Sequence, residues 1–351
     1  MSAQMDVVIS EFQSKRSGRF NAAGKSRLDV LEIARRRGYH HIKLATFDGG
    51  YLAFRKLGQL VRVVLAAGLR AGAGDTVLAQ YPYGRKFDAA YLAGLSCAAR
   101  LRGARLVVLV HDINCLRPDE DFEGSAGLGE VVRVLSCADL VICHSDAMKR
   151  LLVERGLTAT AEVLGPFDYL CDLPAAPRTW SADPVVDVAG NLLPNKSGYA
   201  YGLGKVPGAA FELYGAGYDA DLAEGGRGEV RYMGACAPDE LPGRLAGQYG
   251  LVWDGPSIAT CEGPFGEYLR YNSPHKFSLY VAAGLPVIVW SESALAGFVR
   301  EHGVGIAVDT LEDLGERLRA VRRDEYDAMT ARVRDVAADV VAGNRLGRFL
   351  R

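Results

Sequence analysis

The sequence lacks a long apolar run, and its first residues lack a basic segment followed by an apolar stretch. No run of about 18 consecutive apolar residues occurs, so a transmembrane helix is not expected. The beginning at Met1 does not have the pattern of a secretory signal peptide. We therefore predict a cytoplasmic protein with at most peripheral membrane contact.

The sequence also lacks an excess of charge of one sign. Lys and Arg number 41 and Asp and Glu number 42, which gives a net charge of −1. Proteins that bind nucleic acid usually carry a basic excess or a basic patch. We therefore expect no nucleic-acid partner.

Paired cysteines and grouped metal ligands are missing too. The seven cysteines are odd in number and form no Cys-x-x-Cys pair, so we interpret them as reduced residues. Cys and His are not grouped at zinc spacing. Asp219 and Asp221 form an Asp-x-Asp sequence in a Gly-rich segment, but no other ligands accompany them. We expect no metal site and no cofactor.

What the sequence does contain is an alternation of short β-branched segments and helical patterns, which predicts parallel α/β sheets. At 351 residues the chain is too long for one ordinary core, so we predict two domains. The first spans 1–164 and the second 185–342. They are joined by a linker at 165–184, which carries four prolines, and residues 343–351 form a C-terminal tail.

The predicted strands follow a doubly wound order in both halves. They are 6–10, 41–44, 76–81, 105–110 and 139–143 in the first half, and 185–189, 210–214, 230–233, 251–254, 286–290 and 305–309 in the second. Two consecutive Rossmann-like domains that face each other across a cleft are the GT-B plan, so we predict this α/β fold class. In such sheets, ligands bind at the carboxyl ends of the strands.

The most informative candidate site is the segment that opens a helix after residue 272. Ser273 is a good N-cap, and Pro274 suits the first helical position. The free N–H groups of this turn attract anions, and Lys276 adds a positive charge beside them. Such donors stabilise a departing nucleoside diphosphate. The alternative is an ordinary capped helix with a solvated lysine. We assign to a nucleotide-sugar site Asn272, Ser273, Pro274, His275 and Lys276.

Two further segments follow predicted strands of the second half. Gly190 and Asn191 come directly after 185–189, where a glycine lets the backbone approach a ligand, and Lys196 can reach a phosphate. The alternative is a turn with an exposed lysine. Gly215, after the next strand, is a weaker indication, because a Gly-x-Gly pair often marks only a tight turn.

In the first half, His111 and Asp112 stand at the carboxyl end of the strand 105–110. Either can act as general base toward an acceptor hydroxyl, or can hydrogen-bond a sugar hydroxyl. The alternative is a polar pair that is satisfied within the fold. We predict that one of the two is the catalytic base.

Three stretches together resemble a known family. Glu267–Pro286 resembles the signature Asn-x-Pro-His-Lys-x-Ser-x-Tyr-x-Ala-x-Gly-x-Pro-Val-Ile, and His111–Arg117 and Gly190–Leu192 match further family sequences. The family includes bacterial β-1,6-galactofuranosyltransferases and the glucosyltransferase that adds the second sugar to streptococcal serine-rich adhesins. The resemblance covers nearly the whole chain, and the Pro-His-Lys stretch is fairly specific.

This resemblance implies a GT-B fold, a UDP-sugar donor, metal-independent transfer to a glycan or glycoprotein acceptor, and a homo-oligomer. It also implies that Lys196 and Lys276 contact UDP. An N-terminal loop of the family shapes the active site, and it maps loosely onto Asn21 and Gly24.

The sequence departs from many retaining GT-B enzymes at one position. These enzymes hold the ribose with a glutamate five residues before the glycine of the Gly-x-Pro-Val turn, where this chain has Leu279. We therefore do not transfer their catalytic scheme, and we expect inversion by direct displacement with an enzyme base.

Three other functions remain open. A nicotinamide-dependent oxidoreductase would carry Gly-x-Gly-x-x-Gly after the first strand, whereas Glu11–Arg16 follows it here. A UDP-sugar epimerase of the same fold would need no acceptor. A non-catalytic UDP-sugar-binding partner subunit would show no donor turnover.

Overall fold

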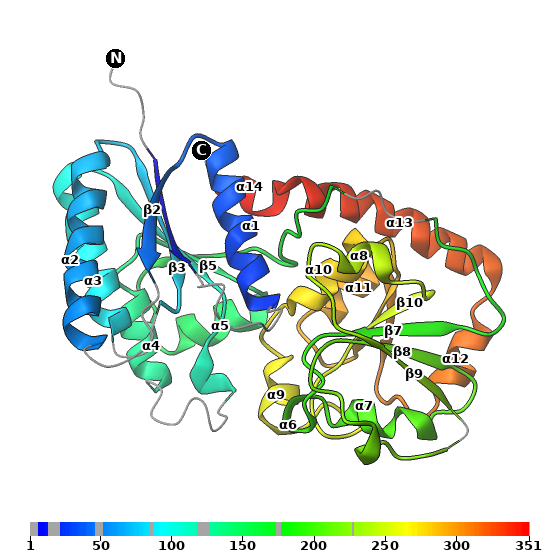
Figure 1. Ribbon diagram of the computed structural model, residues 1–351. Coiled ribbons are helices and arrows are strands. Elements are labelled where there is room, and N and C mark those ends of the chain that lie inside the picture. The colour runs from blue at the N-terminus through cyan, green and yellow to red at the C-terminus, as the bar shows by residue number, and fades with distance from the viewer. Residues whose placement is uncertain are drawn as a thin grey trace. The chain divides into compact units, whose positions relative to one another are not determined.

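The computed structural model describes residues 6–12, 22–45, 52–83, 87–117, 127–172, 177–226 and 228–350. The chain divides into two compact units (Figure 1). The first comprises Met1–Gly18, Ser26–Leu164 and Leu346–Arg351, and the second comprises Arg19–Lys25 and Gly165–Arg345. None of the helices in the described ranges is long and apolar enough to cross a bilayer.

The first unit contains a parallel sheet of order β2-β1-β3-β4-β5-β6. Its elements are β1 (Val7–Phe12), α1 (Ala22–Arg36), β2 (His40–Ala45), α2 (Leu52–Arg70), β3 (Thr76–Tyr81), α3 (Asp88–Arg102), β4 (Arg105–Val110), η2 (Asn114–Leu116), α4 (Leu128–Leu135), β5 (Leu140–Cys143), α5 (Asp146–Glu154) and β6 (Thr160–Val163). Strand β4 is apolar and buried from Leu106 to Val110, as expected for a central strand covered on both faces.

The second unit contains a parallel sheet of order β12-β11-β10-β7-β8-β9. Its elements are β7 (Val185–Ala189), α6 (Pro194–Ser197), α7 (Tyr199–Gly202), η4 (Leu203–Lys205), β8 (Ala210–Tyr214), η5 (Ala220–Leu222), β9 (Glu229–Gly234), α8 (Leu241–Arg244), β10 (Tyr249–Val252), α9 (Gly263–Tyr268), α10 (His275–Ala282), β11 (Val287–Trp290), α11 (Ala296–His302), β12 (Gly305–Val308), α12 (Leu314–Ala320) and α13 (Arg323–Ala342). The strand order reverses between β7 and β10, and the carboxyl side of such a reversal is where open α/β sheets bind ligands.

The two doubly wound sheets confirm the predicted fold class, and two strand predictions need correction. The predicted strand 251–254 is shifted, because β10 ends at Val252 and leaves Trp253 and Asp254 in the following loop. Strand β6 was not predicted. It is a four-residue edge strand with partly exposed side chains, so it lacks the continuous apolar run of a central strand.

Both ends of the predicted second domain are more structured than the sequence indicated. Residues 165–184, predicted as a linker, group with the second unit, where the N–H of Tyr169 donates to the carbonyl of Val340. The predicted tail contains the helix α14 (Asn344–Gly347). Within the first unit, the guanidinium of Arg348 donates to the carbonyl oxygens of Val163 and Leu164, at 2.7 and 2.8 Å.

Candidate functional site

The loops that follow β7 and β10 are hydrogen-bonded to each other at the switch point of the second sheet. The N–H of Gly255 donates to the carbonyl of Lys196 at 3.1 Å, and the N–H of Tyr199 donates to the carbonyl of Gly255 at 3.0 Å. The structure therefore brings together two segments that lie about sixty residues apart, as the strand order requires.

Helix α10 is fixed over this edge of the sheet by Tyr280. A Cβ at Gly250 would lie 2.1 Å from the ring of Tyr280, so only glycine lets the ring lie flat on β10. The hydroxyl of Tyr280 accepts a hydrogen bond of 2.7 Å from the N–H of Ala189, the last residue of β7. One fully buried side chain thus ties α10 to both strands of the switch point.

Two other signature residues bind α10 to the segment 167–169. The hydroxyl of Ser278 donates to the carbonyl of Phe167 at 2.7 Å. The ring of His275 stacks on Tyr169 at 4.9 Å between centroids, and its Nε2 lies 3.2 Å from the carbonyl oxygen of Asp168. Burial lowers the pKa of His275 to about 4, so the ring is neutral at pH 7 and brings no positive charge to the site.

The start of α10 differs from the prediction. The helix begins at His275, and Pro274 occupies the N-cap position with φ −61° and ψ 136° and no side-chain cap bond. The expectation that Ser273 is the N-cap and Pro274 the first helical residue was therefore wrong. With this extended ψ, Pro274 is not a helical residue, although its fixed φ suits both the N-cap and the first helical position.

Asn272 carries a buried polar atom, Oδ1, that has no hydrogen-bond partner among the described residues. Buried side-chain oxygens almost always accept a hydrogen bond from the protein, from ordered water or from a ligand. Asn272 thus offers an acceptor next to the helix start.

Lys276 lies in a largely buried ion pair. Its ammonium donates to Oδ1 of Asp254 at 3.0 Å and to the carbonyl of Trp253 at 2.7 Å. The side chains of Lys276 and Asp254 are only 13% and 8% exposed. An ammonium has three N–H donors, so one is left for a ligand. The alternative of a solvated lysine does not hold, because β10 ends before Asp254 and leaves these two acceptors for Lys276.

The remaining lysine, Lys196, lies half-buried on α6, with its ammonium 5.7 Å from the ring centroid of Phe265. Asn191 holds the turn before this helix, since its Oδ1 accepts a hydrogen bond of 3.0 Å from the N–H of Leu193. The side-chain oxygen of Asn191 is therefore used in local structure.

The two glycines of the predicted site differ in their surroundings. A Cβ at Gly190 would meet no atom within 4 Å, so open space adjoins the backbone there. A Cβ at Gly215 would lie 1.8 Å from the carbonyl oxygen of Gly190. Gly215 therefore permits the close approach of the two loops, which is a structural role.

In the first unit, His111 and Asp112 follow β4 as predicted, but their environments differ. His111 is 8% exposed, with Nε2 2.7 Å from Oε1 of Gln80 and Nδ1 3.4 Å from the hydroxyl of Ser26. The side chain of Asp112 is 30% exposed and pairs with Arg117 at 3.1 Å. Asp112 is the more accessible of the two.

The two N-terminal candidates contribute little. Asn21 lies outside the described residues, and Gly24 lies in the first turn of α1 and not in a loop, which corrects the prediction. Among the residues that can be described, no group of three or more His, Cys, Asp or Glu is placed to hold a metal ion. Asp219 caps a short turn by accepting from the N–H of Asp221 at 3.1 Å.

Sequence reasoning missed Asp254 and Gly250 as contributors to the site. Asp254 lay inside the predicted strand 251–254, and Gly250 lay directly before it. Neither position in a strand pattern indicates a role in a site. The available indication was the sequence Trp253-Asp254-Gly255, since a carboxylate followed by glycine is typical of a turn after a strand.

Two doubly wound units with a site at the β7–β10 switch point have the architecture of GT-B glycosyltransferases. The family models of the glucosyltransferase 3-like family match the chain twice, with the N-terminal domain over residues 6–165 and the C-terminal domain over residues 186–350. The chain belongs to this family, and it is a hexosyltransferase.

Curated relatives match over most of their length. Beta-1,6-galactofuranosyltransferase WbbI of Escherichia coli K12 is 29% identical over 333 residues, which are 93% of this chain and 92% of the relative. Glucosyltransferase 3 of Streptococcus gordonii is 28% identical over 315 residues, which are 87% and 86% of the two chains.

Solved structures with the same fold include two glycosyl-transferring proteins. HepE from Anabaena, crystallised with UDP and glucose, has a TM-score of 0.57 at 15% identity and covers 99% of both chains. The trehalose-6-phosphate synthase OtsA has a TM-score of 0.58 at 11% identity, with coverage of 99% and 98%. At these identities the likeness shows the fold alone.

The buried pair predicts an uneven response to substitution. Lys276→Ala leaves the carboxylate of Asp254 buried without its counter-charge, so we expect the free energy of unfolding to fall by about 3–5 kcal/mol. The double variant Lys276→Ala/Asp254→Asn removes that charge and should recover a large part of the loss. Urea unfolding measures both.

The matched control is Lys205→Ala, because Lys205 pairs with Glu224 on the surface, with side chains 52% and 55% exposed. Exposed pairs contribute little, so this variant should unfold like the wild type. Equal losses for Lys205→Ala and Lys276→Ala, or no recovery in the double variant, would contradict the buried-pair interpretation.

Proposed function

We propose that the protein transfers a hexosyl group from a UDP-sugar to a hydroxyl of a glycan or glycoprotein acceptor, with inversion and without a metal ion. The observation that carries this proposal is the ammonium of Lys276, which is oriented at the β7–β10 switch point and keeps one donor unused. The sugar is of the glucose or galactofuranose class, because the two curated relatives are named for these activities.

The donor site stabilises the leaving group electrostatically. As the bond between the anomeric carbon and the diphosphate oxygen breaks, negative charge grows on UDP. Lys196 on α6 and Lys276 on α10 bring positive charge to this edge of the sheet. The first N–H groups of α10 add oriented dipoles beside them. These groups replace the charge that a metal ion supplies in other transferases.

The acceptor half of the reaction needs a base. The acceptor oxygen forms its bond to the anomeric carbon while its proton passes to the enzyme. Asp112 is our candidate for this base, because it is the more accessible member of the predicted pair, whereas His111 is buried with both ring nitrogens near polar partners. Leu279 is buried and apolar, so that position offers no carboxylate to the donor.

We expect Asp112→Asn to lower kcat by about 10²–10⁴-fold while UDP affinity stays near that of the wild type, because the base acts only on the acceptor. Steady-state kinetics and UDP calorimetry separate the two effects. The control is Asp146→Asn, whose exposed carboxylate also follows a strand of the first unit. A wild-type kcat for Asp112→Asn excludes this carboxylate as the base.

A panel of UDP-sugars, read by UDP release with and without acceptor glycans, tests the proposed reaction. Turnover should persist in EDTA, because lysines and helix N–H groups stabilise the diphosphate. Loss of all turnover in EDTA with recovery in Mn²⁺ or Mg²⁺ would overturn metal independence. Conversion of the UDP-sugar to another UDP-sugar without acceptor would indicate an epimerase instead.

A further inference from the structure

The outer face of α2 carries an apolar ridge that the protein itself leaves uncovered. Its members recur every four residues, which places them on one stripe of the helix. They are Leu57, Val61, Leu65 and Leu69, with exposed fractions of 51%, 50%, 58% and 80%. Exposed apolar residues that occur singly need no explanation, but a continuous stripe of four over about 18 Å of helix is typical of an interaction surface.

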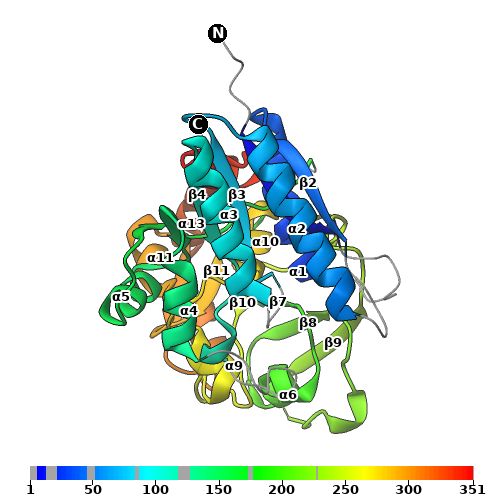
Figure 2. The ribbon, with the colours of Figure 1, turned by 90° about the vertical axis from the view of Figure 1, so that its left-hand side faces the viewer.

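The opposite face of the same helix accounts for its packing in the fold. Leu60, Val63 and Ala67 are buried, at 8%, 0% and 1% exposure. The ridge is therefore a second apolar face of α2, distinct from the face that packs into the core. On α3, which packs beside α2, Leu101 is 81% exposed and extends the apolar surface. Figure 2 shows α2, α3 and α4 next to one another on the face turned to the viewer.

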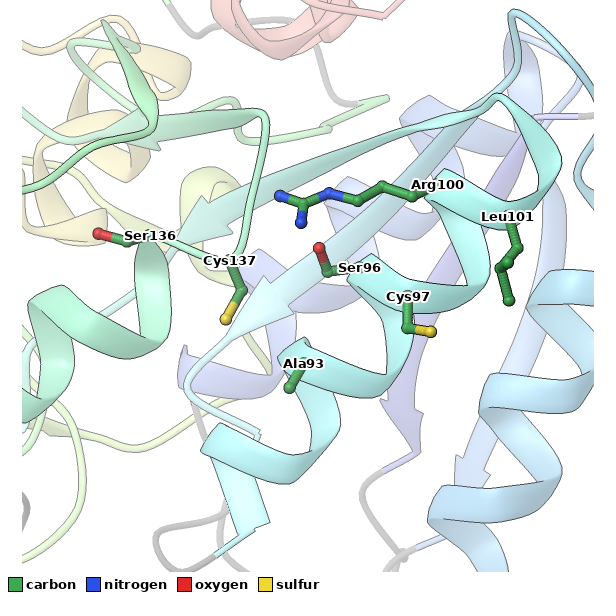
Figure 3. Close-up of a pocket in the computed structure, with 7 residues that line it drawn as sticks. All are labelled: Ala93, Ser96, Cys97, Arg100, Leu101, Ser136 and Cys137. Carbon is green, nitrogen blue, oxygen red and sulfur yellow. The ribbon is translucent and has the colours of Figure 1, made fainter.

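The charged residues of α2 are of one sign. The sequence of α2 contains no Asp or Glu, and Arg62 and Arg70 are exposed alongside the ridge. On α3, a surface pocket of about 540 Å³ adjoins Leu101, and Arg100 is the one charged residue among those that line it (Figure 3). Figure 3 also shows the guanidinium of Arg100 and the side chain of Leu101 extending in different directions from the end of α3.

We propose that this face, formed by the α2 ridge and the basic residues beside it, docks the enzyme on an anionic lipid surface. An apolar helix face lies in the boundary between headgroups and acyl chains, and flanking cations bind anionic headgroups. A second copy of the chain fits less well. A symmetric contact through the ridge would pair this face with itself, and α2 carries no Asp or Glu that could match Arg62 and Arg70 of either copy. The proposal is independent of the donor chemistry proposed above.

Vesicle sedimentation of the full-length protein tests the proposal. The wild type should bind vesicles of phosphatidylcholine mixed with phosphatidylglycerol, bind phosphatidylcholine vesicles much more weakly, and dissociate as salt is raised. Leu65→Gln/Leu69→Gln should lower the partition coefficient by about tenfold or more, because each leucine loses its transfer into the membrane boundary. Circular dichroism and thermal unfolding of this variant should match the wild type, which shows that the unit containing α2 is folded.

The matched control is Leu222→Gln, since Leu222 is 51% exposed on the second unit, away from α2 in the sequence. It should bind vesicles like the wild type. Failure of the wild type to bind anionic vesicles at low salt, or equal binding by the ridge variant, would overturn the proposal. So would a wild-type dimer that the ridge variant dissociates without any vesicle binding, because a second copy would then cover the face.

Discussion

The packing of Tyr280 on Gly250 is the contact on which the proposed donor site depends. Because the ring needs a strand without a side chain, and the hydroxyl needs the free N–H of Ala189, α10 has one position relative to β7 and β10. His275 and Ser278 add contacts to the segment 167–169, so the whole helix start is fixed from two sides. His275, Ser278 and Tyr280 of the family signature therefore hold α10, and with it Lys276, in place.

The ion pair of Lys276 and Asp254 follows from this position. A buried pair is seldom a net gain in stability over apolar residues of similar size. Its value lies in orientation, because two acceptors hold the ammonium at the carboxyl edge of the sheet before any ligand arrives. A charge that is already oriented needs no reorganisation when the leaving group becomes negative, which is how such sites lower a barrier.

Much of the fold was predictable from the sequence, because parallel strands are continuous apolar runs between helical patterns. The strands 76–81, 105–110, 185–189 and 210–214 were located to the residue. The partners of Lys276 were not predictable. They depend on where a strand ends and on which loops meet across a sheet, and a difference of two residues at β10 decided whether Asp254 was a strand residue or an acceptor. Local spacing carries no information on such contacts.

A crystal structure of the protein with UDP tests the central claim most directly. If the β7–β10 edge is the donor site, a diphosphate oxygen should lie about 3 Å from Nζ of Lys276, at the donor that Asp254 and Trp253 leave unused. The uracil and ribose should extend along the loops after β7 and β10. A nucleotide bound at the carboxyl edge of the first sheet, with Lys276 contacting only Asp254 and Trp253, would contradict the account.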